Sequence, residues 1–511
     1  MALRSSLQTF EHRLFGSYVD RDDGQVIPDF FATSIENWII RNRGQIEMRD
    51  GLTARGTSPS ATNLGASVLN RVTASGTLRH LVRVINGASN TSKFQYSETG
   101  TTWIDITGGG SKTTDKVWVF VQANNFLYGV NGTDTPIKYD GSTITTVSAI
   151  PNGHAIEWWK NHMWVFNVDT VPDRLYFSNA SDPETWGGSD FINVNLGDES
   201  RGIGIRGTAG STGRLYVGKE RSVWYITGSS SSNFALNPLT YEHGVASHES
   251  MVGFANAVWC IDLEGNVRRL YRTTEDNPFS ALASSEIQAT IAGFNKSAIE
   301  MATSVFFDNY ALFFVPNGVD QHNSLVLVWD LLANNRRGGW VKFTSWNIAR
   351  AVVWNQTQPQ LFLHDSRSGN GQTYQWTGTS DNGLSITAKY ETKIYDHGFP
   401  ERRKKWKFAY QFAPAQGSVN MRFYTSVDRF YYTLVKTLSL LGTGNKLLGV
   451  DWTLGTDKLG SGGYVQQKVR FNEAGANNKG YSMQIKLEAE SSTVKIKLRE
   501  FTMHYRVRGL R

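Results

Sequence analysis

Residues 116–147 read KVWVFVQANNFLYGVNGTDTPIKYDGSTITTV, and they contain four short apolar runs separated by turns. The runs are KVWVFVQ, NFLYGV, PIKYDG and STITTV, and the turns are rich in Gly, Asn and Asp. Such runs predict strands, because β-branched and aromatic side chains suit a pleated surface whereas Gly and Asn suit tight turns. The pair Asp140-Gly141 predicts a hairpin, since it accepts the positive φ that a tight turn requires. The stretch therefore predicts one small sheet of four strands.

Comparable apolar runs recur along the chain from about residue 78 onward, and helical periodicity is almost absent. They are spaced by about 40 to 50 residues, which is the period of β-propeller blades with several strands each. We therefore expect an all-β fold in which residues 55–395 form a β-propeller of six or seven blades. One short amphipathic helix, capped by Ser and Glu side chains, is expected over residues 284–295. The recurring runs are HLVRVI, KVWVFV, HMWVFNV, RLYVG, AVWCIDL, YALFFVP and QLFLHD.

The pattern changes near residue 390, where apolar and polar residues begin to alternate strictly. The segment TVKIKLREFTMHYRVR, residues 493–508, predicts half-buried strands with one basic face. We expect residues 396–511 to form a separate antiparallel β-sandwich, and residues 1–54 to be an extended arm that docks on the propeller or on a neighbouring subunit. Residues 442–463, rich in Gly, Leu, Thr and Asp, are a candidate mobile or subunit-contacting loop.

The charge is distributed unevenly along the chain. Residues 401–511 carry 20 Lys and Arg against 8 Asp and Glu, whereas residues 1–400 carry 32 against 37. A basic surface attracts phosphates through screened point charges, without reading bases. The alternative is a solvated face or a subunit contact neutralised by salt bridges. The candidates for a DNA channel or a subunit contact are Arg402, Arg403, Lys404, Lys405, Lys407, Lys495, Lys497, Arg499, Arg506 and Arg508.

No group of residues in the sequence predicts catalysis or metal binding. The ten histidines are scattered, without the HExxH spacing or the Cys/His cluster that binds zinc. His243 and His248 lie in a loop rich in Gly and Ser, and we interpret them as solvated. DRDDG at residues 20–24 lacks the later Glu of a calcium loop, because Phe31 stands at that position. The single cysteine, Cys260, lies in an apolar run and is expected to be buried and inert.

The sequence also lacks the signals of several other classes of protein. It has no Walker-type phosphate loop, and its arginines are not grouped as in sialidases. It has no apolar run of about 18 residues, and its first residues lack the apolar core of a signal peptide. We therefore expect a soluble protein folded in a reducing cytoplasm, with no enzyme activity, no cofactor, no metal and no disulfide bond.

Three segments resemble the tail propeller proteins of bacteriophages. SIENWIIRNRGQIEMRDGLTARGT, residues 34–57, resembles the opening of many such proteins, with an Asn-aromatic pair, a Gly and then Arg-x-Gly-Leu. RLYFSNASDPETWGG, residues 174–188, and RLYVGKERSVWYITGS, residues 214–229, are similar to two of their blades. The basic sandwich that ends in YRVRGLR also fits. The resemblance covers nearly the whole chain, and the family is that of the tail hub or nozzle proteins of short-tailed phages, also called packaged-DNA stabilisation proteins.

The resemblance implies a non-enzymatic part of the virion tail that is assembled in the host cytoplasm. Members of the family form a six-fold ring below the portal and adaptor proteins and continue the DNA channel. They help to retain packaged double-stranded DNA and offer docking surfaces for tailspikes, fibres or a tail needle. No residue-level site is carried over from the family to this sequence.

Two alternatives belong to other functional classes. A receptor- or glycan-binding tail propeller, such as a fibre or a lectin, predicts exposed aromatic side chains on one propeller face. A glycosidase predicts carboxylates and arginines that converge in the central channel of the propeller.

Overall fold

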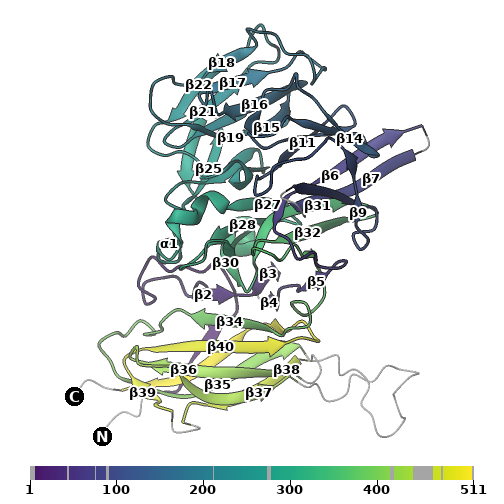
Figure 1. The fold of residues 1–511 in the computed structure, drawn as a ribbon. Coiled ribbons are helices and arrows are strands. Elements are labelled where there is room, and N and C mark those ends of the chain that lie inside the picture. Colours follow the sequence, from purple (N-terminus) through teal and green to yellow (C-terminus); the bar gives the residue numbers. More distant parts are fainter. Residues whose placement is uncertain are drawn as a thin grey trace, which may run out of the picture. The chain divides into compact units, whose positions relative to one another are not determined.

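The computed structural model describes residues 6–42, 45–74, 76–87, 91–210, 212–272, 278–414, 419–440, 464–472 and 476–508. The chain divides into two compact units. The first unit consists of Met1–Thr53, Leu327–Thr344 and Thr377–Arg511, and the second of Ala54–Val326 and Ser345–Trp376. Strands make up most of the regular structure in both units (Figure 1).

In its described residues, the second unit contains strands of seven sheets that follow one another along the chain. The first sheet consists of β6 (Asn63–Thr73), β7 (Gly76–Asn86), β8 (Ser92–Ser97) and β9 (Ile104–Asp105). The second consists of β11 (Val119–Ala123), β12 (Phe126–Val130), β13 (Ile137–Tyr139) and β14 (Thr143–Thr146), with β10 (Thr107–Gly108) beside β14. The third consists of β15 (Gly153–Trp159), β16 (His162–Val168), β17 (Arg174–Phe177) and β18 (Phe191–Asn193). The next two consist of β19 (Gly202–Gly207), β20 (Leu215–Lys219), β21 (Val223–Thr227) and β22 (Ala235–Thr240); and of β23 (Val252–Phe254), β24 (Ala257–Ile261), β25 (Val267–Arg272) and β26 (Pro278–Leu282).

The remaining two sheets complete the series of seven. The sixth begins with β27 (Thr303–Phe307), β28 (Tyr310–Pro316) and β29 (Asn323–Asp330), and the boundary falls within β29. The seventh consists of β31 (Ile348–Asn355), β32 (Pro359–Asp365) and β33 (Thr373–Trp376), with β5 (Leu52–Ala54) as its outer strand. Short helices connect some of the strands: η1 (His248–Ser250), α1 (Gln288–Ala292), η2 (Lys296–Met301) and α2 (Ala333–Arg336).

The first strands of the seven sheets form a closed ring in the described part of the chain. The strands β6, β11, β15, β19, β23, β27 and β31 are neighbours in this order, and β31 lies beside β6 again. This arrangement is a seven-bladed propeller, so the prediction of an all-β propeller with six or seven blades is confirmed. Its core lies between neighbouring blades, where Trp118 packs between the first and second and Trp164 between the third and fourth.

Local signals in the sequence are partly confirmed. Asp140 Oδ1 accepts hydrogen bonds from the N–H groups of Ser142 (2.8 Å) and Thr143 (2.7 Å), and Gly141 has a φ of +93°, as the predicted hairpin requires. A helix forms within the predicted range 284–295, and its N-cap residue is Ile287, whose side chain makes no capping hydrogen bond.

Among the residues that the structure describes, the first unit is built from strands of three sheets. The first has the order β1 (Gln8–His12), β42 (Phe501–Val507), β35 (Lys404–Pro414) and β38 (Tyr464–Arg470), with β39 (Lys479–Gly480) also paired to β35. The second has the order β30 (Gly339–Thr344), β2 (Ala32–Glu36), β34 (Ile386–Thr392), β40 (Met483–Ser491), β36 (Asn420–Val427) and β37 (Thr433–Ser439). The third has the order β3 (Trp38–Asn42), β4 (Gln45–Met48) and β41 (Lys497–Leu498).

The first two sheets of this unit face each other as a mostly antiparallel sandwich, as predicted. Residues that point inward from both are fully buried, among them Trp406 on β35 and Leu487 on β40. Rings from the two sheets meet in the core, where the centroids of Phe423 and Phe471 are 6.2 Å apart. The unit therefore has its own apolar core.

The unit boundaries differ from the predicted domain boundaries. Residues 1–54 are not a separate arm, because β1, β2, β3 and β4 are strands of the first unit. The second unit ends at Trp376 and not at residue 395, since β34 pairs with β2 and β40 of the first unit. These pairings join segments that lie hundreds of residues apart in the sequence, so local patterns did not indicate them.

Residues that carry the resemblance to tail propellers have structural roles in the first unit. The guanidinium of Arg49 is fully buried and makes a bidentate ion pair with Asp381, at 2.8 and 2.6 Å. Arg49 Nε also donates to Asn37 Oδ1 (2.8 Å), and Asn37 adopts a φ of +59°. A side chain at Gly51 would collide with the backbone of Ser380. Through the contacts of Arg49 with Asp381 and of Gly51 with Ser380, the N-terminal segment packs against residues 377–511.

Candidate functional site

Three cations lie side by side on the outer face of the first sheet of the first unit. Lys405 on β35 is opposite Arg506 on β42 on one side, and opposite Lys479 on β39 on the other. The residues next to them in β35 and β42, Trp406 and Tyr505, are buried, so the alternation of the strands turns the three cations away from the core.

Two further cations extend this row. The strand β35 has a β-bulge between Trp406 and Phe408, and the extra residue in this bulge is Lys407, two residues after Lys405. Partial burial, and then the positive charges of Lys405 and Arg506, lower the pKa of Lys407. Arg470 on β38 is exposed opposite Phe408. We call Lys405, Lys407, Arg470, Lys479 and Arg506 the basic face.

The charges of the basic face are not compensated by described residues. None of its five cations forms an ion pair or a side-chain hydrogen bond within the described part of the chain. The nearby acids Glu11 and Glu500 are both in contact with Arg13, at 2.8 and 3.3 Å. Like charges opposite each other on neighbouring strands destabilise a sheet. The cations of the basic face therefore repel one another, and an anionic partner would reduce this repulsion.

The structure separates the ten basic residues proposed from the sequence into four groups. Lys405, Lys407 and Arg506 belong to the basic face. Arg403 and Arg508 are exposed and adjoin its end, where Arg508 N donates to Arg403 O (2.8 Å). Lys404, in contrast, is buried, and its Nζ donates to the carbonyl oxygens of Phe399 and Tyr481; burial lowers the pKa of Lys404.

The remaining candidates are already paired. Lys495 forms an ion pair with Asp50, and Lys497 forms one with Glu47 at 3.7 Å. Arg499 Nε donates to Gln45 Oε1 (3.3 Å), and Arg402 is 3.2 Å from Glu401. The segment 494–508 is also divided, because β41 pairs with β4 in one sheet and β42 with β35 in another. The expectation of a single basic strand face from Lys495 to Arg508 is therefore wrong.

Sequence reasoning missed Lys479 and Arg470. Lys479 has no basic neighbour in β39, and Arg470 has only Lys468 beside it in β38; both join the cluster through cross-strand register, which the sequence does not reveal. The candidate loop 442–463 lies outside the described residues.

A second candidate site is a cavity of about 440 Å³ on the axis of the propeller. We call it the axial cavity. Its wall includes Val119 on β11, His154 on β15, Ile203 on β19 and Arg350 on β31, together with residues 246–249 before β23. Because these are the first strands of four different blades, the cavity lies where the blades converge.

Most charges around the axial cavity are paired. His154 Nε2 lies 2.8 Å from Asp169 Oδ1. Arg201 contacts both Glu220 (2.6 Å) and Glu300 (2.9 Å). Of the three lining carboxylates that the structure describes, Asp169 contacts His154, Glu300 forms an ion pair with Arg201, and Glu249 has neither kind of described partner.

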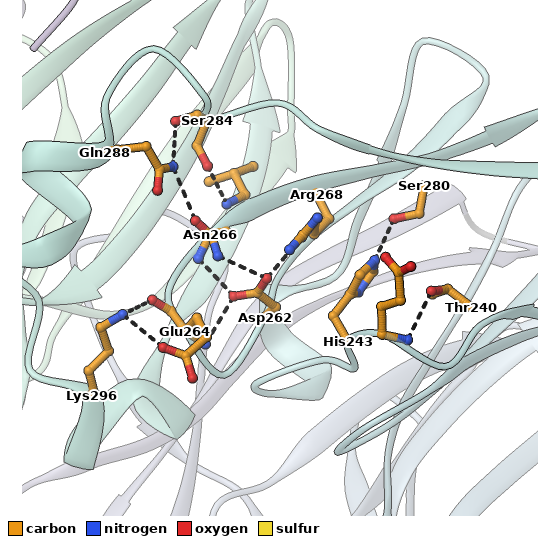
Figure 2. Close-up of polar contacts among 12 residues, drawn as sticks. Thr240, His243, Asp262, Glu264, Asn266, Arg268, Ser280, Ser284, Gln288 and Lys296 are labelled. Atoms are coloured by element: carbon orange, nitrogen blue, oxygen red, sulfur yellow. Dashed lines mark hydrogen bonds and ion pairs between the residues drawn. The ribbon is translucent and has the colours of Figure 1, made fainter. Parts of the chain in front are cut away.

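The two loop histidines are not solvated, contrary to the sequence interpretation. His248 lines the axial cavity and is buried, and burial, followed by the charges of Arg206 and Arg350, keeps its pKa well below 6.5. His243 is half-buried, and its Nε2 lies 2.8 Å from Ser280 Oγ (Figure 2). Its Nδ1 has no hydrogen-bond partner in the described part of the chain, so no described acid orients His243 for nucleophilic catalysis.

Exposed aromatic rings are present at the outer edge of two neighbouring blades. Tyr241, which follows β22, is 62% exposed, and Phe279 on β26 is 51% exposed. The strands β22 and β26 are in contact. These rings are the feature that the glycan-binding alternative predicts.

Some other kinds of site are not found in the part of the chain that the structure describes. No group of three or more His, Cys, Asp or Glu side chains is placed to hold a metal ion there. Among the same residues, no helix has the length and apolar character needed to cross a membrane. Cys260 is buried, and burial raises the pKa of its thiol, as expected for an inert cysteine.

Fold and surfaces together define a β-propeller protein. No family model matches the sequence, and no curated protein matches it. Among solved structures, the chain is similar to Raptor of Chaetomium thermophilum, with a TM-score of 0.41 and 12% identity, covering 65% of this chain and 29% of that one. It is also similar to the WD40 domain of coronin from Toxoplasma gondii, with a TM-score of 0.38 and 10% identity, covering 67% and 88%. YCF48 from Cyanidioschyzon merolae has a TM-score of 0.37 and 6% identity, covering 64% and 98%.

Proposed function

We propose that this chain is a non-enzymatic structural protein of the tail of a short-tailed bacteriophage. In this role it is a hub or nozzle subunit of a hexameric ring in the virion, and the ring continues the DNA channel below the portal and adaptor proteins. It retains packaged double-stranded DNA and docks distal tail parts such as tailspikes, fibres or a needle. The observation that carries the proposal is the basic face, and the resemblance of residues 34–57 to tail propellers supports it.

The chemistry of the basic face suits a phosphate backbone. Its five cations have no described ion-pair partner, and three of them stand in one row across neighbouring strands. Lysine and arginine neutralise phosphates without reading bases, and the binding weakens as salt increases. A ring made by repeating one heterologous contact would bring several copies of this face around a channel.

The salt dependence of DNA binding tests the proposal. In the full chain we expect the double variant Lys405→Gln/Arg506→Gln to bind duplex DNA more weakly. The slope of log K against log salt should become shallower by about 2, because each lost phosphate contact removes roughly 0.9. The matched control is Lys495→Gln/Lys497→Gln, whose charges are already paired with Asp50 and Glu47. Its slope should equal that of the parent.

Other outcomes would overturn parts of the proposal. An unchanged slope for Lys405→Gln/Arg506→Gln would show that the basic face does not contact DNA. In assembled particles, unaltered DNA retention after Arg506→Glu/Arg508→Glu would lead to the same conclusion. Electron microscopy should show six-fold rings at the tail vertex, whereas monomers or trimeric spikes would contradict a hub.

A further inference from the structure

Two opposite charges on the wall of the axial cavity have no ionic partner. Arg350 is 8% exposed, and its guanidinium donates from Nη1 to the carbonyl oxygen of Ala349 (2.6 Å). Its Nε has no hydrogen-bond partner in the described part of the chain. The carboxylate of Glu249 likewise forms no ion pair or side-chain hydrogen bond with a described residue. A buried guanidinium without a carboxylate partner is costly, so its place in the wall needs an explanation.

The two groups influence each other but do not pair. The negative charge of Glu249 raises the pKa of Arg350, although burial lowers it by more. No ion pair within 4.0 Å joins them, whereas His154–Asp169 and Arg201–Glu300 at the same cavity are joined at 2.8 and 2.9 Å. Among the described residues of the cavity wall, Arg350 is therefore a cation and Glu249 a carboxylate without an ion-pair partner, and both border the same space.

We propose that the axial cavity binds a small zwitterion with a carboxylate and an ammonium group on neighbouring atoms, such as a free α-amino acid. The carboxylate pairs with the guanidinium of Arg350, whose planar fork suits it. The ammonium group pairs with Glu249. The ligand would thus form an ion pair with each of the two side chains, Arg350 and Glu249, which do not pair with each other.

Ligands with a single charge satisfy only half of this arrangement. An anion would pair with Arg350 but would lie beside Glu249 and leave it unpaired. A cation would pair with Glu249 but would meet the charge of Arg350. His248, which also lines the cavity, stays neutral because its pKa is held well below 6.5, so it adds no charge to either side. The volume of about 440 Å³ lies within the range of small-molecule sites.

The site is independent of the basic face and of any role in a phage tail. Every residue of its wall belongs to the second unit, whereas the basic face belongs to the first. Failure of one proposal therefore leaves the other standing.

The test compares L-alanine, on the full chain, with two analogues that each lack one of its charged groups. L-Alanine carries both groups, propionate lacks the ammonium group, and ethylamine lacks the carboxylate. Isothermal titration calorimetry and ligand-induced shifts of the melting temperature should show binding of L-alanine and much weaker binding of the other two. L-Leucine and L-glutamate, tested in the same way, report how large a side chain the cavity accepts.

Variants connect the binding to the two charges. Arg350→Gln and Glu249→Gln should each weaken L-alanine binding roughly tenfold to a hundredfold, because each removes one charge-assisted contact. Lys138→Gln, which breaks an ion pair with Glu184 away from the cavity, should bind like the parent. If Arg350→Gln does not fold by circular dichroism, Glu249→Gln and Arg350→Lys carry the test. Equal binding of L-alanine and propionate, no binding of any zwitterion, or binding that survives the variants would overturn the proposal.

Discussion

The ring of His12 is held between two tyrosine hydroxyl groups in the core of the first unit. Nε2 lies 3.0 Å from the hydroxyl of Tyr390, and Nδ1 lies 3.0 Å from that of Tyr395. A neutral imidazole can donate one of these hydrogen bonds and accept the other. Burial lowers the pKa of His12 from 6.5 to about 4, and the charge of Asp29 offsets this only in part. Protonation of His12 thus makes the stability of the β-sandwich in the first unit depend on pH.

We expect the first unit to lose stability in mild acid. The pKa of His12 is lower in the folded than in the unfolded state, so the unfolded chain binds the proton first. The contribution of His12 is complete above about pH 6.5 and is lost as the pH falls toward about 4, by up to about 3 kcal/mol. Urea unfolding across this pH range measures the loss. His12→Gln does not titrate and should show a flatter dependence, and a dependence identical to that of the parent would refute the assignment.

The turn between β24 and β25 shows how one carboxylate organises an element. Asp262 accepts hydrogen bonds from the N–H groups of Glu264 (3.0 Å) and Asn266 (2.9 Å), and from Arg268 Nε (2.8 Å) (Figure 2). Nearby, Ser284 Oγ accepts a hydrogen bond from Val267 N (3.0 Å), so this hydroxyl stabilises the first residue of β25. Ile287, at the N-terminal end of α1, makes no side-chain cap hydrogen bond.

We expect Asp262→Ala to destabilise the second unit by about 2 to 4 kcal/mol. The substitution leaves two turn N–H groups and the Arg268 guanidinium without their acceptor in a buried position. The matched control is Glu264→Ala in the same turn, whose side chain is 80% exposed and which should change stability by about 0.5 kcal/mol or less. Thermal or urea unfolding measures both variants. Similar values for the two would argue against this role of Asp262.

The first unit is assembled from three chain segments that are distant in sequence. β42 pairs with β1, and β34 pairs with both β2 and β40. The buried ion pair between Arg49 and Asp381 connects the N-terminal and C-terminal segments at another point. The C-terminal strands consequently depend on residues that lie before the propeller in the sequence.

We predict that residues 396–511 expressed alone do not fold cooperatively. Without residues 1–53 and 377–395, β42 lacks its partner β1 and β40 lacks its partner β34, so both sheets expose open edges. Circular dichroism with urea, together with amide hydrogen exchange, compares the fragment with the full chain. A sharp unfolding transition and protected amides in β40 and β42 of the fragment would contradict the prediction.

The sequence by itself determined the features that depend on neighbours along the chain. The alternation of short apolar runs with turns, and their period of about 40 to 50 residues, was enough for an all-β propeller, because most blades are made of consecutive strands. The burial of Cys260 and the Asp140-Gly141 hairpin were accessible for the same reason. The excess of basic residues in the C-terminal part was also evident.

Only the tertiary structure decided which of those basic residues act together. Register across strands brought Lys479 and Arg470 to Lys405 and Arg506, and it paired Lys495 and Lys497 with acids of the N-terminal segment. It also placed Arg350 and Glu249 on one cavity wall, about a hundred residues apart in sequence. Strand pairing and blade closure set these distances through long-range contacts, and local residue patterns carry no information about partners that far away.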